Sequence, residues 1–120
     1  MEEKLAGRWG EGKAADYLKG KGYSIIGLNY HCRMGEIDII ASDDKYIIFA
    51  EVKMRKSPSF ARAMEYVTLS KQEKIKITAS VWLSQNETAL QPRFDVIEIY
   101  AKDGMKSENI TINHIKNAFQ

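Results

Sequence analysis

The stretch GEIDIIASDDKYIIFAEVK, residues 35–53, decides the fold that this sequence predicts. Its two apolar runs, IDII and YIIFA, are typical of buried strands, and a short polar segment separates them. Glu36, Asp38 and Glu51 nevertheless place three carboxylates in or beside these runs, and Lys53 adds an ammonium group. Burying a charge is costly unless the charge is paired or holds a metal ion. The stretch therefore predicts a hairpin that carries a charged site.

The geometry of this hairpin predicts which side chains meet. A two-residue turn at residues 44–45 makes Asp38 face Glu51 and Glu36 face Lys53, all on one face at the end away from the turn. That face becomes apolar nearer the turn. The opposite face is expected to be wholly apolar, with Ile37, Ile39, Ala41, Ile48, Ala50 and Val52. Because both faces carry apolar residues, we expect both to be covered, as in a central strand pair of an α/β protein.

Carboxylates that face each other across a sheet repel unless a cation lies between them. Lys53 is one candidate for that cation. A divalent ion is another, because hard cations such as Mg²⁺ favour carboxylate and carbonyl oxygens. A cluster of surface salt bridges at a strand end explains the spacing equally well.

Glu11 could add a further acid to this site. It precedes Ala14, Ala15 and Leu18 by three, four and seven residues, so it shares their inward face on a helix predicted over residues 5–19. From that face it could reach the charged end of the hairpin. The alternative is a solvated glutamate in the first turn, which the helix dipole favours.

The other segments predict a single α/β domain over residues 1–120. A strand is expected at residues 23–29, and the S-K-Q-E capping box, with Ser70 as N-cap, opens a helix that ends near Gln85. Another strand follows at residues 94–100, and the tail at residues 109–119 fits either a strand or a helix. The order α-β-β-β-α-β predicts a sandwich with at least one antiparallel hairpin.

Composition and charge limit the classes of function. The net charge is +2 and Cys32 is the only cysteine, so no internal disulfide or cysteine-rich zinc site is expected. His31 and Cys32 are adjacent and have no distant partner, which is poor spacing for zinc ligands, so a packed or loop role is favoured for both. No apolar run approaches the roughly 18 residues that span a membrane, and the acidic, glycine-rich N-terminus is unlike a signal peptide. We expect a cytoplasmic protein with no membrane partner.

A basic segment follows the hairpin. Residues 55–76 carry six Lys or Arg side chains and two acids, which gives a local charge of +4. This charge predicts a phosphate-binding face, although a solvated face is the simpler alternative. Lys71 is the most informative member, because a cation in the first turn of a helix opposes the helix dipole unless that end collects phosphate.

Several motifs together resemble a known family. They are G-R-W-G-E, Y-L-x-x-x-G-Y, N-Y-H-C-R-M-G-E-I-D-I-I-A, F-A-E-V-K-M-R, R-F-D-V and, in the tail, H-I-K-N-A-F. In this combination the sequence resembles the YraN family of small bacterial predicted endonucleases within the PD-(D/E)xK nuclease superfamily. That family is similar in fold to archaeal Holliday-junction resolvases. Ile37 stands where the superfamily name has proline.

The resemblance implies a restriction-endonuclease-like sandwich, with a mixed central sheet flanked by helices, and a set of site residues. Asp38, Glu51, Lys53 and Glu11 would be catalytic, and the Val52 carbonyl would join the three acids as metal ligands. Mg²⁺ would be the cofactor, with Mn²⁺ as substitute. The expected DNA contacts are Arg55, Lys56, Arg62, Lys71, Arg33 and Arg8.

The implied function is metal-dependent hydrolysis of DNA, structure-selective for branched substrates in repair or recombination, by a possible homodimer. The alternative is a non-catalytic nucleic-acid-binding module on the same fold. Two acids remain outside this set. A structural salt bridge is favoured for Glu36, and Asp95 is expected to pair with Arg93. Trp9 and Trp82 are expected in the core, although Trp9 could stack on a base.

Overall fold

A computed structural model describes residues 2–56 and 67–120 of the chain. The elements in chain order are α1 (Glu2–Gly20), β1 (Ser24–Cys32), β2 (Gly35–Ser42), β3 (Tyr46–Arg55), α3 (Leu69–Gln85), β4 (Gln91–Tyr100), a 3₁₀ turn η1 (Gly104–Lys106) and β5 (Thr111–Phe119). The C-terminal tail, for which the sequence fits either a strand or a helix, therefore forms a strand. None of the helices in these ranges is long and apolar enough to cross a membrane.

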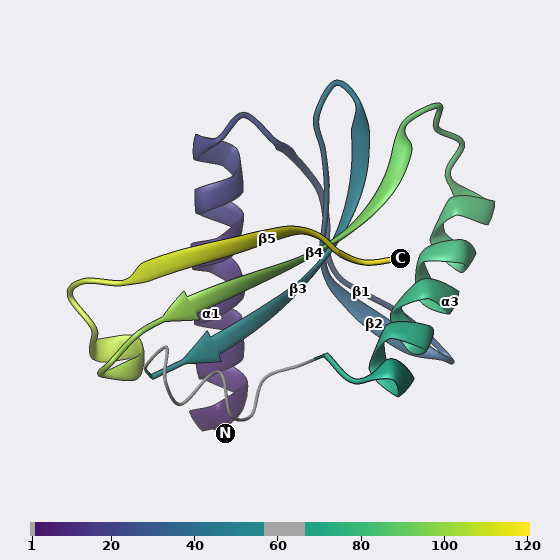
Figure 1. Ribbon diagram of the computed structural model, residues 1–120. Coiled ribbons are helices and arrows are strands. Elements are labelled where there is room, and N and C mark those ends of the chain that lie inside the picture. The colour runs from purple at the N-terminus through teal and green to yellow at the C-terminus, as the bar shows by residue number, and fades with distance from the viewer. Residues whose placement is uncertain (1, 57–66) are drawn as a thin grey trace.

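The five strands form one mixed sheet in the order β1-β2-β3-β4-β5. β3 and β4 are parallel, because α3 carries the chain from the end of one back to the start of the other, and the remaining neighbours are antiparallel. α1 and α3 flank this sheet from two sides (Figure 1). The predicted mixed sheet with flanking helices, as a restriction-endonuclease-like sandwich requires, is confirmed.

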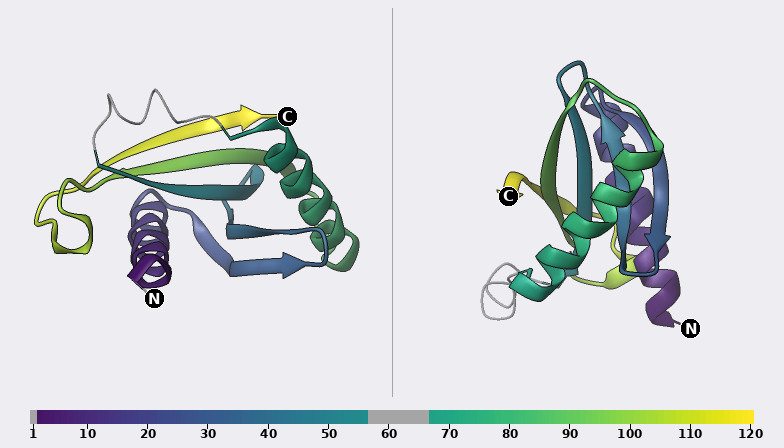
Figure 2. Two further views of the ribbon diagram at one scale, coloured as in Figure 1. Left: turned by 90° about the horizontal axis from the view of Figure 1, so that it is seen from below. Right: turned by 90° about the vertical axis from the view of Figure 1, so that its right-hand side faces the viewer.

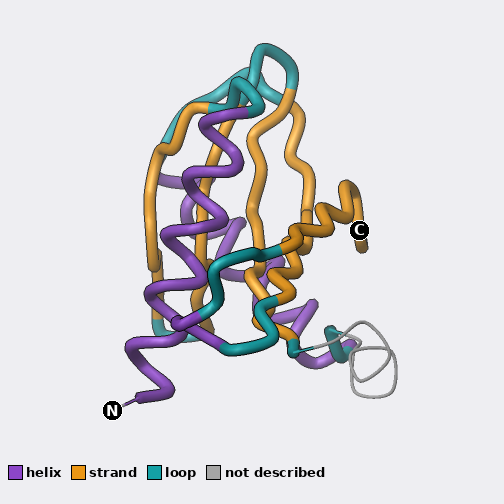
Figure 3. The backbone as a smooth tube through the Cα atoms, turned by 90° about the vertical axis from the view of Figure 1, so that its left-hand side faces the viewer, coloured by secondary structure: helices purple, strands orange, loops and turns teal. Residues whose placement is uncertain are grey.

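Each helix covers its own apolar core. Ala14, Ala15 and Leu18 of α1 pack on one face of the sheet, against the cluster Ile39, Ala41, Ile48, Ala50, Ile97 and Ile99. Figure 3 views the molecule from the α1 side and shows this helix running along the strands. On the other face, α3 packs Ile75, Ala79 and Trp82 against Ile40, Ile47, Phe49 and Val96. Trp82 is a core residue as predicted, and Trp9 packs against the first cluster.

The predicted hairpin register is confirmed near the turn but not at its charged end. Ile39 pairs with Ala50 and Ser42 pairs with Ile47, as the two-residue turn requires. The recorded pairing of β2 with β3 ends at Ile39, so the pairs predicted for Glu36 and Asp38 do not form.

A bend in the β1–β2 hairpin explains this difference. Asn29 of β1 has φ 53° and interrupts the pairing with β2 beside Asp38, between the pairs Leu28–Ile39 and Tyr30–Ile37. Figure 2 shows the far end of this hairpin turning away from β3 and lying beside α3. Ile37 consequently packs in the α3 cluster, not on the α1 face where strict alternation placed it.

The start of α3 differs by two residues from the prediction. Thr68 is the N-cap, and its side-chain oxygen accepts a hydrogen bond from the Lys71 backbone N–H at 3.1 Å. Ser70 therefore lies inside the first turn and does not cap the helix. The C-terminal end of the helix, at Gln85, is where the sequence predicts it.

Candidate active site

The candidate site lies where β2 leaves β3. Asp38 sits at this fork and is 9% exposed, and its Oδ2 accepts the backbone N–H of Val52 at 2.8 Å. This side-chain contact replaces the backbone pairing of β2 with β3, which starts at the next residue, Ile39. The Val52 N–H thus holds the Asp38 carboxylate against β3, where the charge of Glu51 acts on it.

The electrostatic environment of Asp38 is unfavourable for its charge. Burial, followed by the charge of Glu51, raises the pKa of Asp38 from 3.8 to about 7, with smaller contributions from Glu11 and Glu36. The Val52 N–H opposes this rise but does not cancel it. The charges of Glu51, Glu11 and Glu36 therefore all act on Asp38, and they leave negative charge that a cation would neutralise.

Two ammonium groups contact the second buried acid. Glu51 is 6% exposed, and its Oε1 lies 3.2 Å from Lys71 Nζ and 3.6 Å from Lys53 Nζ. Burial alone would lower the pKa of Lys71, but the Glu51 carboxylate raises it above its ordinary value. Lys71 therefore joins the acidic site from the first turn of α3 and stays protonated there.

Glu36 and Glu11 belong to the site less directly than the buried acids Asp38 and Glu51. Glu36 is exposed and pairs in register with His31 of β1, and Lys53 contacts Glu51 in place of the expected Glu36. Glu11 is half-buried on α1 and influences Asp38 through its charge. Over residues 2–56 and 67–120, no group of three or more His, Cys, Asp or Glu side chains is arranged to hold a metal ion.

Two carboxylates nevertheless suit a Mg²⁺ ion. This ion is commonly held by one or two carboxylates, while waters and substrate phosphates supply the remaining ligands. The raised pKa of Asp38 supports the same interpretation, because burial and then the charge of Glu51 disfavour the carboxylate, and a bound cation would stabilise it. Asp38 and Glu51 thus fit a hard divalent cation, with Val52 fixed beside them by its N–H.

The predicted DNA contacts other than Lys71 fall into three groups. Three of the side chains are exposed: Arg8 on α1, Arg33 in the β1–β2 turn and Lys56 after β3. Arg55 is largely buried, with its Nε 3.8 Å from Glu98 Oε2. Arg62 lies outside the described residues.

Glu98 is a buried acid that the sequence analysis missed. It is 8% exposed, lies opposite Lys53 in the parallel register of β4 with β3, and accepts hydrogen bonds from Tyr100 (3.0 Å) and Asn113 (2.8 Å). A signal for it exists in the run VIEIY, where one acid interrupts an apolar strand. The residues that lie opposite Glu98 on β3 and β5 could not be deduced from the sequence, because they depend on the pairing register of β4.

A second polar cluster is built around Asp95, which pairs with Ala50 in the register of β4 with β3, on the face of the sheet that α1 covers. Arg93 donates two hydrogen bonds to fully buried Asp95, at 2.8 and 2.9 Å, as the sequence predicts. Asp95 also accepts the His114 Nε2–H at 2.7 Å and the Asn117 backbone N–H at 3.0 Å. Burial alone would raise the pKa of Asp95, but these hydrogen bonds lower it below its usual value. The cluster is structural, because its charges are paired.

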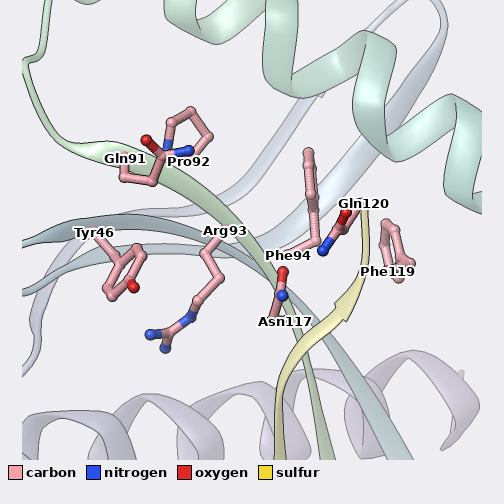
Figure 4. A pocket seen from close by; sticks show the side chains of 8 residues that line it. All are labelled: Tyr46, Gln91, Pro92, Arg93, Phe94, Asn117, Phe119 and Gln120. Atoms are coloured by element: carbon pink, nitrogen blue, oxygen red, sulfur yellow. The ribbon is translucent and has the colours of Figure 1, made fainter.

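A pocket of about 470 Å³ borders this second cluster. Figure 4 shows Arg93 pointing away from Phe94, with the amides of Gln91, Asn117 and Gln120 around the opening. Tyr46 at the start of β3 also lines it, whereas Glu51 and Lys53 lie further along the same strand. This pocket is separate from the acidic site.

Comparisons with known proteins cover nearly the whole chain. The family model described as "Uncharacterised protein family UPF0102" matches residues 10–99. A "UPF0102 protein" of Caldicellulosiruptor saccharolyticus is 40% identical over 99% of this chain and all of its own length. Relatives under the same description in Caldanaerobacter subterraneus and Caldicellulosiruptor bescii are 44% and 46% identical over 99% of this chain and 98% and 100% of their own lengths.

Proposed function

The chain belongs to the uncharacterised protein family UPF0102, the YraN family, and for this member we propose a Mg²⁺-dependent endonuclease that hydrolyses DNA phosphodiester bonds. The observation that carries the proposal is the fork between β2 and β3. There, Asp38 and Glu51 concentrate negative charge beside two lysines, and the pKa of Asp38 is raised to about 7. Two buried carboxylates with an adjacent ammonium suit phosphoryl chemistry better than they suit a purely structural role.

Each residue of the fork has a distinct part in the proposed reaction. Asp38 and Glu51 would hold Mg²⁺, or Mn²⁺ as its substitute, and Glu11 would act through bound water. When bound, the ion would polarise the phosphoryl oxygen and lower the pKa of a water molecule. Lys53, which is partly exposed beside Glu51, would position the attacking water and stabilise the charge that develops on the phosphate.

The basic side chains around the fork support DNA as the substrate. Lys71 presents its ammonium within 3.2 Å of Glu51, so a phosphate held there would meet a cation and a helix N-terminus together. Arg33 and Lys56 are exposed and free to follow the backbone of the nucleic acid. We include branched DNA, processed in repair or recombination, as the proposed preferred substrate. Symmetric cutting of such a substrate would require a homodimer.

The test is cleavage of end-labelled linear, flap and four-way DNA in Mg²⁺ or Mn²⁺. We expect wild type to cut, with branched DNA preferred, and Asp38→Asn and Lys53→Ala to lose at least about a hundredfold in rate. Glu73→Gln is the control, because Glu73 is exposed on α3 and pairs only with Lys76 at 3.6 Å among the described residues. Binding without cleavage in either metal would favour the non-catalytic module. Equal cleavage by all four proteins would show that the fork is not the catalytic site.

A further inference from the structure

A second pocket opens beside the acidic fork, on the same face of the sheet. It has a volume of about 290 Å³ and is lined by Val67, Gln72, Val96, Glu98, Ile115, Ala118 and Phe119. Val96 lies opposite Glu51, and Glu98 lies opposite Lys53, in the register of β3 with β4. Adjacent strands are about 4.8 Å apart, so the pocket begins one strand away from the proposed catalytic groups.

The walls of this pocket suit a flat apolar group. Val67 from the approach to α3, Val96 from β4 and Phe119 from β5 contribute apolar surface, and Phe119 stacks on Phe94 at 5.2 Å between ring centroids. The volume, about 290 Å³, is just below the roughly 300–1,000 Å³ found for ligand pockets. That space accommodates one small ring system and excludes a base pair.

Two polar side chains of the pocket, Glu98 and Gln72, carry hydrogen-bond acceptors. Glu98 Oε1 is occupied by Tyr100 and Asn113, whereas within the described residues Oε2 has only the 3.8 Å contact with Arg55. Gln72 donates its Nε2–H to the Val67 carbonyl at 2.8 Å, which leaves its Oε1 as a second acceptor. Two acceptors complement an amino group, which offers two N–H donors.

We propose that this pocket holds an unpaired nucleobase with an exocyclic amino group, from the nucleotide next to the bond that is cut. The inference rests on the proposed nuclease function and specifies its substrate. Cytosine meets the requirement, because its N4 amino group donates, whereas thymine presents the O4 acceptor at the same position. A base can enter only when it is outside the duplex, as at a flap, a gap or a junction.

The pocket can be tested without cleavage, by measuring binding of labelled single-stranded oligocytidine and oligothymidine in EDTA at one fixed salt concentration. We expect wild type to bind the cytosine strand about tenfold more tightly, the factor that one hydrogen bond to a charged group supplies. Glu98→Gln retains an oxygen for Tyr100 and Asn113 but replaces the Oε2 acceptor, which also pairs with Arg55, with an N–H donor, so the ratio should fall to about one. Glu73→Gln should retain the wild-type ratio.

A second variant blocks the pocket without altering Glu98. Ala118 is exposed at the pocket wall, so Ala118→Trp should fill the space and lower the affinity for the cytosine strand to that for thymine. Equal affinities of wild type for the two strands, or a tenfold preference that survives in Glu98→Gln, would overturn the proposal. If the preference follows Glu98 while no DNA is cut in Mg²⁺, the pocket stands and the proposed nuclease function fails.

Discussion

Asp38→Asn is expected to make the protein more stable at neutral and alkaline pH, although Asp38 belongs to the proposed catalytic site. Burial and the charge of Glu51 raise the pKa of Asp38 to about 7 in the folded chain, against 3.8 in the absence of these effects. Ionisation of this carboxyl therefore favours the unfolded chain. The contribution of Asp38 to the free energy of unfolding is therefore fully present below about pH 3.8 and is lost as the pH rises towards 7.

The magnitude follows from the difference between the two pKa values. It is about three units, and each unit corresponds to about 1.36 kcal/mol, so ionised Asp38 lowers the free energy of unfolding by about 4 kcal/mol at pH 8. At pH 4 the same calculation gives less than about 1 kcal/mol. Asparagine carries no charge, and its oxygen can still accept the Val52 N–H at 2.8 Å. The stabilisation by Asp38→Asn should therefore grow with pH.

Urea unfolding of the two proteins between pH 4 and 8.5, in EDTA, measures this difference. We expect the two free energies to agree to within about 1 kcal/mol near pH 4, to diverge up to about pH 7 and to stay apart above it, with Asp38→Asn the more stable. Glu73→Gln should follow the wild-type curve at every pH, because Glu73 is exposed. Parallel curves for wild type and Asp38→Asn, or a variant that is less stable at pH 8, would refute the electrostatic account of the fork.

Four further substitutions test other parts of the structure. Asp95→Asn should lower the free energy of unfolding by about 3 kcal/mol at pH 7, because it leaves the buried Arg93 without an ionised partner; a loss below about 1 kcal/mol in urea unfolding would contradict this. Thr68→Ala should cost about 1 kcal/mol in thermal unfolding and Ser70→Ala less than about 0.5 kcal/mol, and the opposite order would contradict the cap. Lys71→Ala should slow DNA cleavage at least about tenfold, and an unchanged rate would remove Lys71 from the site.

Local rules predicted much of the hairpin correctly. A two-residue turn and strict alternation together fix the pairing of Ile39 with Ala50, since a slip by one residue would expose an apolar face. The same rules failed at Ile37, because the bend there depends on Asn29 in the neighbouring strand adopting φ 53°. A conformation imposed by another strand leaves no signal in the alternation of β2 itself.

The site was predictable where residues are close in sequence and less so where strands meet through a crossover. Glu51 and Lys53 lie two residues apart, so their shared face follows from strand geometry. Glu98 faces the same region only because α3 sets the parallel register of β4. The N-cap prediction, Ser70, was wrong because Thr68 is also a good N-cap residue, and only the backbone shows that the helix begins at Leu69.

The most direct test of the central claim is the position of Mn²⁺ in crystals of the protein soaked with this ion, read from its anomalous scattering. We predict a peak between the carboxylates of Asp38 and Glu51, and its loss in Asp38→Asn crystals treated in the same way. Glu73→Gln crystals should retain the peak. A wild-type protein that cuts DNA in Mn²⁺ but shows no peak at these two carboxylates would contradict the account.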